Sequence, residues 1–408
     1  MSLKYYLAWF LPSILFILNI SQTRAQDIEL IYTLAVAWSH NGQYLASASV
    51  QPDELNGYLQ VIDAETMSLE YSFESQQGGF TSVTWSPDDQ FIAAGNFDGT
   101  VWIFDLTEDR QIATLRGHQS TISSVDWDSS GTRLVSGGNW DELVILWDMT
   151  TYQRITDLKM TATISNVEFS PNDEQIAVTN EIGLFVFPAT LDVSANHNQI
   201  VADRIRALAW SPDGVYIAVG VETIASHTGN QQNATLYTVD ARTLSIIQRY
   251  TIPSEAIMSV DWSPDSRFIA IYNNNDSVNL LDTTNANIIG YFAGEGTSRY
   301  SINSLDFSLY GGRLAYGTVT NSTSQQSNRG TSHVEGIVIV VPNPSIDLLQ
   351  TIAQACNAPL PIIESLNSSI ATNQLSNLIT QLESLPIDSI PPACAADLIA
   401  VAEAIQSQ

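Results

Sequence analysis

The stretch that decides the fold is ISSVDWDSSGTRLVSGGNWDELVILWD, which runs from Ile122 to Asp148. Val125 and Trp127 stand two residues apart, and this spacing places both side chains on one face of a strand. The turn-forming residues 128–131 separate this strand from a second apolar segment at Leu134, and a third apolar run leads to Trp147 and Asp148. The stretch therefore predicts three consecutive strands joined by hairpins.

The same pattern occurs seven times, at intervals of 41 to 52 residues. In each copy an apolar residue lies two positions before an aromatic residue, and a Leu or Ile followed by Ala or Val lies seven positions after it. The aromatic residues, termed anchors below, are Trp38, Trp85, Trp127, Phe169, Trp210, Trp262 and Phe307. A period in the forties predicts four-stranded units, and we expect the residues at these offsets to form the core between the units.

At this point the chain resembles the WD-repeat family of β-propellers, over roughly residues 30–352. The third repeat carries the family's marks: Gly117-His118 before the first strand, Ser136 in the second, Asp141 in the hairpin turn, and Trp147-Asp148 at the end of the third. The resemblance implies that His118, Ser136, Asp141 and Trp147 form a hydrogen-bonded tetrad with a structural role. The periplasmic propeller of the Tol system, whose blades also contain Ser-Pro-Asp-Gly turns, is the alternative family.

The predicted fold is all-β: a seven-bladed β-propeller of four-stranded antiparallel blades, followed by a small α-helical C-terminal tail. Residues 27–352 are assigned to the propeller and residues 353–408 to the tail. In the tail, apolar residues recur at helical spacing between Leu375 and Leu385 and again from Ala395 to Ile405, on either side of Pro391-Pro392.

Residues 1–25 are predicted to be a signal peptide, with Lys4 as the charged start, an apolar run from Tyr5 to Ile20, and a polar approach to Ala25. An uncleaved membrane anchor is the alternative. The apolar run of 16 residues is shorter than the about 20 residues that span a bilayer. We therefore expect a secreted or extracytoplasmic protein, extracellular or periplasmic, with no membrane association beyond the targeting signal.

The composition is strongly acidic, with 15 Lys plus Arg against 43 Asp plus Glu and a formal net charge of −28. Such a surface repels nucleic-acid phosphates and anionic lipid headgroups, which proteins bind through Lys and Arg. Nucleic acid is thus not an expected partner. The acidity is explained either by solubility outside the cell or by recruitment of cations or basic partners.

Cys356 and Cys394 are the two cysteines of the chain, and both lie in the tail. In an oxidising compartment they are expected to form a disulfide. The five histidines are scattered without metal-ligand spacing, and the acidic pairs fall in predicted turns, so neither a metal site nor a cofactor is predicted. No nucleophile or phosphate-loop motif indicates catalysis.

Phe97 and Trp140 are the candidate partner-binding residues, because they fall at the hairpin tips of neighbouring repeats and large aromatics can anchor an interface. The alternative is that each ring packs onto its own turn. Three insertions occupy the same connection in other repeats, at residues 51–57, 221–233 and 318–335. In the resembled fold these connections open on one face, and insertions on one face of a repeat array commonly mark its binding side.

The predicted function is that of a non-catalytic extracytoplasmic scaffold that binds a protein partner through this face. The alternative is a secreted, hydrolase-like propeller enzyme with its site at the central channel. Carboxylates or histidines that converge at the channel with an open metal position would favour the enzyme.

Closure of the ring is predicted without an N-terminal strand, since the position that such a strand would need coincides with the end of the signal peptide. Leu349 to Ile352 is expected to supply the fourth strand of the last blade instead. Closure would then depend on packing between the first and last blades, with the cysteine-linked tail beside their junction.

Overall fold

The structure is a computed structural model. It describes residues 28–51, 56–76, 78–192, 198–201, 204–222, 233–254, 256–274, 277–293, 304–308, 310–317, 319–323, 337–340, 352–353, 358, 378–380, 382 and 390–406. The predicted signal peptide therefore lies outside the described residues, as do Cys356 and most of each insertion. Among the described residues, no helix combines the length and the apolar character that a membrane span requires.

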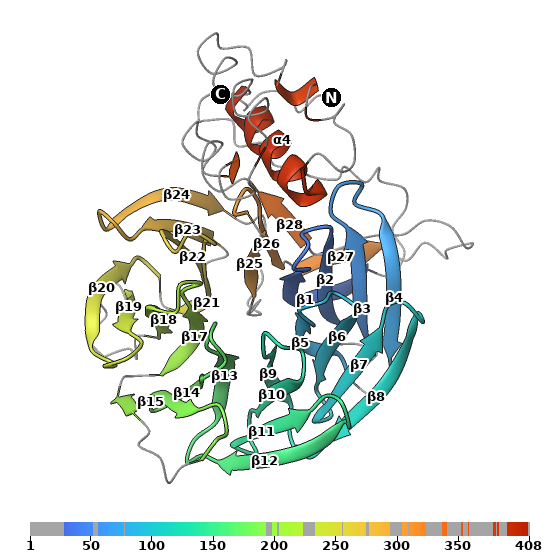
Figure 1. Cartoon of the computed structure of the whole chain (residues 1–408), viewed down its shortest axis with the longest axis vertical. Coiled ribbons are helices and arrows are strands. Elements are labelled where there is room, and N and C mark those ends of the chain that lie inside the picture. Colours follow the sequence, from blue (N-terminus) through green and yellow to red (C-terminus); the bar gives the residue numbers. More distant parts are fainter. Residues whose placement is uncertain are drawn as a thin grey trace.

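Seven antiparallel sheets surround a central axis, and the first strand of each lies nearest to it (Figure 1). Blade 1 contains β1 (Ile28–Trp38), β2 (Tyr44–Gln51), β3 (Asn56–Asp63) and β4 (Leu69–Ser75). Blade 2 contains β5 (Phe80–Trp85), β6 (Phe91–Asn96), β7 (Thr100–Asp105) and β8 (Arg110–Arg116). Blade 3 contains β9 (Ile122–Trp127), β10 (Arg133–Gly138), β11 (Leu143–Asp148) and β12 (Gln153–Lys159).

Blade 4 contains β13 (Ile164–Phe169), β14 (Gln175–Asn180), β15 (Gly183–Pro188) and β16 (Asn198–Val201). Blade 5 contains β17 (Ile205–Trp210), β18 (Tyr216–Val221), β19 (Ala234–Asp240) and β20 (Ile246–Ile252). Blade 6 contains β21 (Ile257–Trp262), β22 (Phe268–Asn273), β23 (Ser277–Asp282) and β24 (Asn287–Ala293). Blade 7 contains, within the described residues, β25 (Leu305–Phe307), β26 (Leu314–Gly317) and β28 (Ile337–Val340). The predicted seven-bladed propeller is confirmed.

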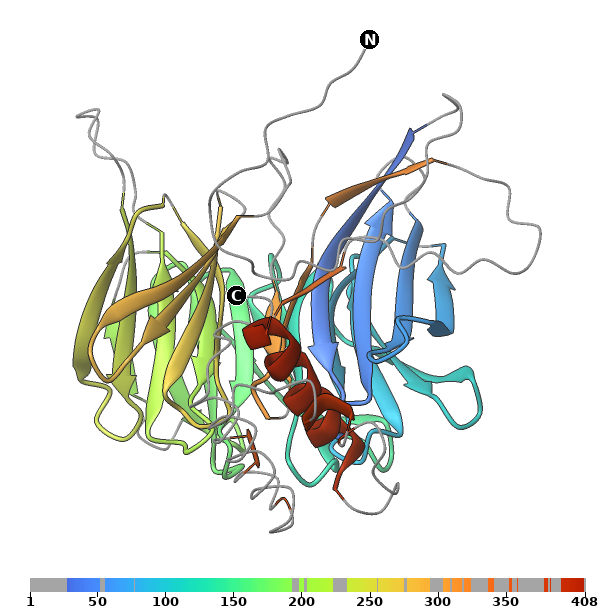
Figure 2. The ribbon, with the colours of Figure 1, turned by 90° about the horizontal axis from the view of Figure 1, so that it is seen from above.

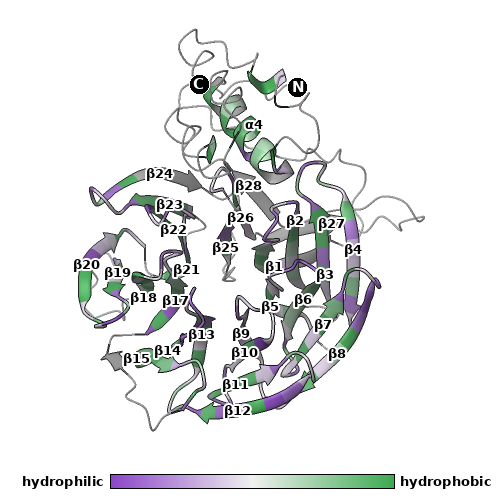
Figure 3. Cartoon of the chain, in the orientation of Figure 1, coloured by the Kyte–Doolittle hydropathy of each residue, from purple (hydrophilic) through white to green (hydrophobic). Residues whose placement is uncertain are grey.

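The recurrent offsets of the sequence form the core. In every blade the anchor aromatic pairs across the first hairpin with the Leu or Ile seven positions later, as Trp127 does with Leu134. All seven of these Leu and Ile side chains have no exposed surface, and all seven anchors are buried. Their clusters join neighbouring blades: Val135 and Val144 of blade 3, for example, pack with Phe169 and Ile176 of blade 4. Figure 3 shows that the outer strands, such as β8 and β12, carry both hydrophilic and hydrophobic segments.

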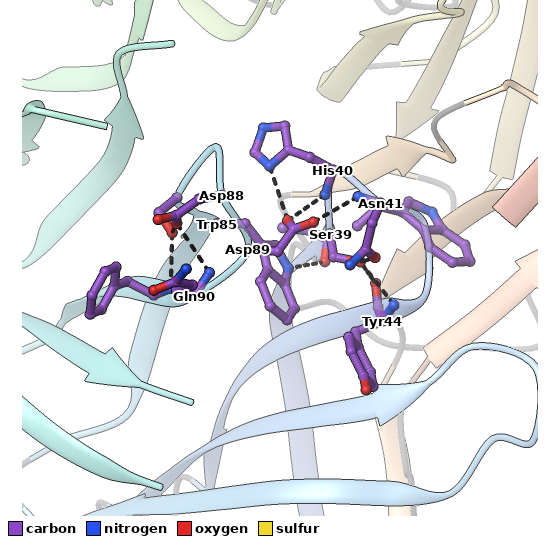
Figure 4. Close-up of polar contacts among 12 residues, drawn as sticks. Ser39, His40, Asn41, Tyr44, Trp85, Asp88, Asp89 and Gln90 are labelled. Carbon is purple, nitrogen blue, oxygen red and sulfur yellow. Dashed lines mark hydrogen bonds and ion pairs between the residues drawn. The ribbon is translucent and has the colours of Figure 1, made fainter. Parts of the chain in front are cut away.

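The turn after each anchor has left-handed backbone at its fourth residue, with φ between 57° and 76° in all seven blades. The residues are Gly42, Asp89, Gly131, Asp173, Gly214, Ser266 and Gly311. Where Asp occupies this position, its carboxylate reaches the preceding blade. Asp89 accepts hydrogen bonds from the backbone N–H groups of His40 (2.6 Å) and Asn41 (2.8 Å) (Figure 4). These turns therefore join adjacent blades on one face of the disc, which is called the turn face below.

The ring closes through a strand pairing that the sequence did not predict. The N-terminal part of β1, residues 28–32, pairs with β27 (Val319–Thr323), which belongs to the insertion between β26 and β28 of blade 7. Figure 2 shows β1 extending beyond the other strands of its blade to meet β27. The expectation that no strand links the first and last blades is therefore wrong, because β1 is long enough to pair with β2 at one end and with β27 at the other.

The tail contains helix α4 (Pro392–Gln406), which lies outside the ring beside the junction of blades 7 and 1 (Figure 1). Its first residue is a proline, whose fixed φ suits the first turn of a helix. Leu378, Leu382 and Leu398 pack together in one buried cluster, and Tyr310 of blade 7 packs against that cluster. The predicted strand at Leu349 to Ile352 is wrong at its end, because Ile352 is helical and belongs to this cluster; residues 349–351 lie outside the described part.

Candidate protein-binding face

A chain of hydrogen bonds fixes the third blade. Trp147 Nε1 donates to Ser136 Oγ at 2.8 Å, Ser136 Oγ lies 2.8 Å from His118 Nε2, and His118 Nδ1 lies 3.1 Å from Asp141 Oδ2. Because indole can only donate and a carboxylate can only accept, one proton order satisfies the chain: Ser136 donates to Nε2, and Nδ1–H of a neutral His118 donates to Asp141. Burial favours this neutral form and lowers the pKa of His118, against the opposing effect of Asp141.

The hydrogen-bonded chain also orients the neighbouring hairpin tip. Asp141 accepts a second hydrogen bond, from the backbone N–H of Gln119 (2.7 Å), and the N–H groups of Trp140 and Asp141 both donate to Ser120 Oγ at 3.0 Å. Gly138 is required beside them, because a Cβ there would lie 2.0 Å from Asp141 Oδ1. The backbone that carries Trp140 is thus held on both sides.

Three large apolar side chains are exposed at the tips of three successive blades. They are Phe97 (43% exposed), Trp140 (74%) and Ile182 (41%), and each lies in the connection between the second and third strands of its blade. These values show that Trp140 does not pack down onto its own turn. The three insertions occupy the same connection in blades 1, 5 and 7, so the strand ends that flank them lie on the same face, called the tip face below.

Ile182 was missed in the sequence because it follows Asn180-Glu181 in a short turn and is not aromatic. A comparison of all connections between second and third strands would have found it. Asn180 shapes this turn, since its Oδ1 accepts the N–H groups of Ile182 (2.9 Å) and Gly183 (3.1 Å).

Ion pairs balance the charge around these tips. Lys159 contacts Glu142 (3.0 Å), and Arg204 contacts Glu181 (2.7 Å). Arg206 contacts Glu222 at 2.7 Å. The hydrogen bond from Arg204 lowers the pKa of Glu181 below its usual value. In a chain with a net charge of −28, these pairs give Glu142, Glu181 and Glu222 basic partners close to the apolar tips.

Four carboxylates gather between the innermost strands, each one residue before an anchor: Asp126, Glu168, Asp261 and Asp306. Each accepts a hydrogen bond from the backbone N–H of the anchor in the next blade, at distances of 2.7, 3.2, 2.8 and 2.6 Å respectively. Burial raises the pKa of Asp126 and of Asp261 to about 7. Burial also raises the pKa of Glu168 and of Asp306 well above the usual range, and the charge of Asp261 adds to the effect on Asp306.

These carboxylates are the groups that an enzyme site at the centre of the ring would need. Their geometry instead joins one blade to the next, because an oxygen of each is held by a backbone N–H. Within the described ranges, no three His, Cys, Asp or Glu side chains are grouped so that they could hold a metal ion. The arrangement therefore gives no support to the hydrolase alternative.

Of the two cysteines, Cys394 on α4 is fully buried. Cys356 lies outside the described residues, so its pairing with Cys394 stays a prediction.

Comparisons with known proteins agree with this geometry. The family model described as the IFT140 first beta-propeller matches residues 22–167. WD repeat-containing protein slp1 of Schizosaccharomyces pombe is 24% identical over 260 residues, which is 60% of this chain and 49% of slp1. Eukaryotic translation initiation factor 3 subunit I of Pyricularia oryzae is 23% identical over 261 residues, which is 60% of this chain and 74% of that protein. The protein is a β-propeller whose repeats are similar to those of WD-repeat proteins.

A third relative is Cell division cycle 20.1, cofactor of APC complex, from Arabidopsis thaliana. It is 26% identical over 178 residues, or 41% of this chain and 38% of its own length. The matched part is thus about half of slp1 and less than half of this third relative. The similarity of this propeller to these relatives covers only part of their length, and their whole-protein activities do not follow from it.

The hydrogen-bonded chain of blade 3 yields a testable prediction for the stability of the propeller. Ser136→Ala removes the hydroxyl that accepts from Trp147 and leaves buried polar groups unpaired, so the free energy of unfolding should fall by about 1–3 kcal/mol. Urea denaturation measures this change. Ser245→Ala, at an exposed turn position, is the matched control and should change stability by less than about 0.5 kcal/mol. Equal effects of the two substitutions would contradict a role for this chain in stability.

Proposed function

We propose that the protein is a non-catalytic extracytoplasmic scaffold that binds a protein partner through the tip face. The single observation that carries the proposal is Trp140, a tryptophan that is 74% exposed on a backbone fixed by the His118–Asp141 contact and by Ser120. Tryptophan is strongly over-represented among the residues that dominate binding energy at interfaces. Because the backbone at Trp140 is already held in place, little backbone freedom is lost when a partner covers the indole.

The neighbouring tips and charges support the same role. Phe97 and Ile182 place apolar side chains on the blades before and after Trp140. The pairing of Lys159 with Glu142 and of Arg204 with Glu181 neutralises the acidic groups beside them. The WD repeat-containing protein slp1 is similar to 60% of this chain, and the insertions of blades 1, 5 and 7 would extend the same surface.

The extracytoplasmic setting rests on the apolar N-terminal segment and on the chemistry of the tail. The run from Tyr5 to Ile20 has the length and the flanks of a signal peptide. The proposed disulfide between Cys356 and Cys394 requires an oxidising compartment.

The test begins by cross-linking the full chain in its source cells and recovering the partner by pull-down from the extracytoplasmic fraction. Recovery only from the cytoplasm, with Met1 intact, would contradict the proposed location. With the partner in hand, Trp140→Ala should weaken binding by at least about tenfold, as measured by titration calorimetry. The melting curve should stay unchanged, because the side chain is exposed.

Ile155→Ala is the matched control. Ile155 lies in the same blade, on outer strand β12, and is 50% exposed. It should leave affinity within about twofold of wild type, as expected for a residue outside the interface. Unchanged affinity in the Trp140 variant, or an equal loss in the Ile155 variant, would place the binding site elsewhere.

A further inference from the structure

The turn after each anchor requires a hydrogen-bond acceptor at its centre. In blades 1, 2, 4, 5 and 6 the residue three positions after the anchor supplies it: Asn41, Asp88, Asn172, Asp213 and Asp265. In each of these turns one side-chain oxygen accepts the hydroxyl of the serine that follows the anchor, at 2.5–2.8 Å. The same oxygen accepts the backbone N–H five positions after the anchor, at 2.8–3.2 Å.

In blade 3 the acceptor at the centre of the turn is an acid one position after the anchor. Asp128 accepts the backbone N–H groups of Thr132 and Arg133, both at 2.9 Å. Six of the seven blades therefore contain their own acceptor.

Blade 7 lacks an acceptor at these positions, because Ser308 follows its anchor and Tyr310 stands two residues later. The acceptor comes from α4 instead. Asp397 Oδ2 accepts from Ser308 Oγ at 2.7 Å and from the backbone N–H of Gly312 at 3.2 Å. These are the two donors that the internal Asp or Asn satisfies in the five other blades.

The second oxygen of Asp397 links the helix to the junction of blades 7 and 1. Oδ1 accepts from Arg313 Nε at 2.6 Å, and the guanidinium donates to the carbonyl oxygens of Ala64 (3.2 Å) and Gly42 (3.4 Å) in blade 1. The same group lies over the Trp38 ring, 4.6 Å from its centre. Both partners of the ion pair are buried, Asp397 at 1% and Arg313 at 6% exposed.

Blade 3 has the equivalent of the Arg313 contact, but there the acid belongs to the blade itself. Arg133 pairs with Asp128 at 2.9 Å, donates to the carbonyl oxygens of Ala189 and Asp173, and lies over the Phe169 ring of blade 4. The same arrangement therefore occurs at two junctions, between blades 3 and 4 and between blades 7 and 1. In each, an arginine paired with an Asp donates to two carbonyl oxygens of the next blade and lies over its anchor ring. The two junctions differ in the origin of the acid, which the C-terminal helix supplies to blade 7.

Gly312 shows that blade 7 is shaped to receive the helix. A Cβ at Gly312 would lie 2.7 Å from Asp397 Cβ, which is closer than two non-bonded carbon atoms approach in proteins. In blade 3, where none of the described helical residues docks on the turn, Thr132 occupies this position. Tyr310, which replaces the internal acceptor, packs against the apolar cluster of the tail.

We propose that α4 completes the turn of blade 7 and thereby holds blade 7 against blade 1. Its Asp397 carboxylate accepts hydrogen bonds from three donors, which belong to Ser308, Gly312 and Arg313. The tail is then a structural part of the ring and not an appended domain. Release of the helix removes the acceptor from Ser308 and Gly312 and leaves Arg313 without its carboxylate, so the junction of blades 7 and 1 loosens first.

Amide hydrogen exchange on the full chain tests this proposal. Asp397→Ala should speed exchange by at least about tenfold in α4, in β25–β26 and at residues 36–38 of β1, because a hydrogen-bonded charge pair is lost at their junction. Exchange in blades 3 and 4 should stay unchanged. Leu398→Ala loosens α4 but keeps the carboxylate, and it serves as the control for helix packing alone.

The decisive variant moves the acceptor back into the turn. Tyr310→Asp in the Asp397→Ala background gives blade 7 the residue that Asp213 and Asp265 provide in blades 5 and 6. Protection of β25–β26 should return to within about threefold of wild type while α4 continues to exchange rapidly. If Asp397→Ala alone fails to fold, recovery of a folded chain in the double variant is the expected result.

Two outcomes overturn the proposal. One is an Asp397→Ala variant in which only α4 loses protection while β25, β26 and residues 36–38 exchange as in wild type. The other is a double variant in which blade 7 remains as unprotected as in Asp397→Ala, because the missing acceptor would then not explain the loss.

Discussion

Replacing Trp127 with alanine is expected to lower the free energy of unfolding by about 3–5 kcal/mol. Trp127 is 8% exposed and belongs to the cluster that joins blades 2 and 3, with Ile103 of the former and Leu134 of the latter. Truncation removes the buried indole and leaves a cavity between two sheets. The other blades of the propeller prevent these sheets from moving together to fill it. The urea midpoint measures the loss.

Trp140→Ala is the matched control for this large effect. The residue type, the substitution and the blade are the same, but Trp140 is 74% exposed. Its loss should change stability by less than about 0.5 kcal/mol. Similar midpoints for the two variants would mean that the recurrent anchors do not form the core between blades.

Lowering the pH from 8 to 5.5 is expected to stabilise the protein, which is the second large effect. The pKa of Asp126 and that of Asp261 are raised to about 7 in the folded chain, whereas an unfolded Asp titrates near 3.9. The folded state then binds more protons than the unfolded state between these values, so its stability rises as pH falls through 7. Each group can contribute up to about 2 kcal/mol by pH 5.5.

One histidine acts in the opposite direction. Burial lowers the pKa of His118, so the unfolded state takes up a proton on this residue first and stability falls below about pH 6.5. Because four carboxylates have raised pKa values, we expect their contribution to exceed that of His118 over this range.

The double variant Asp126→Asn and Asp261→Asn tests the origin of the pH effect. An amide oxygen can still accept the N–H groups of Phe169 and Phe307, but it does not titrate. Urea midpoints should then be higher than wild type at pH 8, and the gap should shrink at pH 5.5. Asp240→Asn is the control. Hydrogen bonds from Thr243 lower the pKa of Asp240, so this carboxyl group does not titrate between pH 8 and 5.5. A decrease of the wild-type urea midpoint when the pH is lowered from 8 to 5.5 would contradict this account of the carboxylates.

The propeller could be predicted from the sequence because its core depends on pairs that are close in the chain. An anchor such as Trp85 pairs with Ile92 across one hairpin, so the spacing is visible in every repeat. The carboxylates one position before the anchors were missed for a different reason. Asp126 bonds to the N–H of Phe169 in the next blade, and nothing in a single repeat indicates that partner.

Contacts at the closing junction were the least predictable. The missing acceptor of blade 7 is visible in the sequence as Tyr310, at the position where five of the other turns have Asp or Asn. The residue that replaces it, Asp397, lies in a helix with no repeat pattern and could not be assigned before the tail was placed. The pairing of β1 with β27 could not be predicted, because β27 lies within an insertion rich in Ser, Thr, Asn and Gln that has no strand pattern.

The pairing of β1 with β27 also has a consequence during protein synthesis. Ser304 exchanges hydrogen bonds with the backbone of Val36, 268 residues earlier, and β27 lies further along the chain. At about 5–20 residues per second, the ribosome needs on the order of tens of seconds to deliver these partners. Until then the free edge of β1 at residues 28–32 has no strand to pair with, and such an edge can recruit another nascent chain. A factor that covers this edge in the interval would protect the unfinished ring.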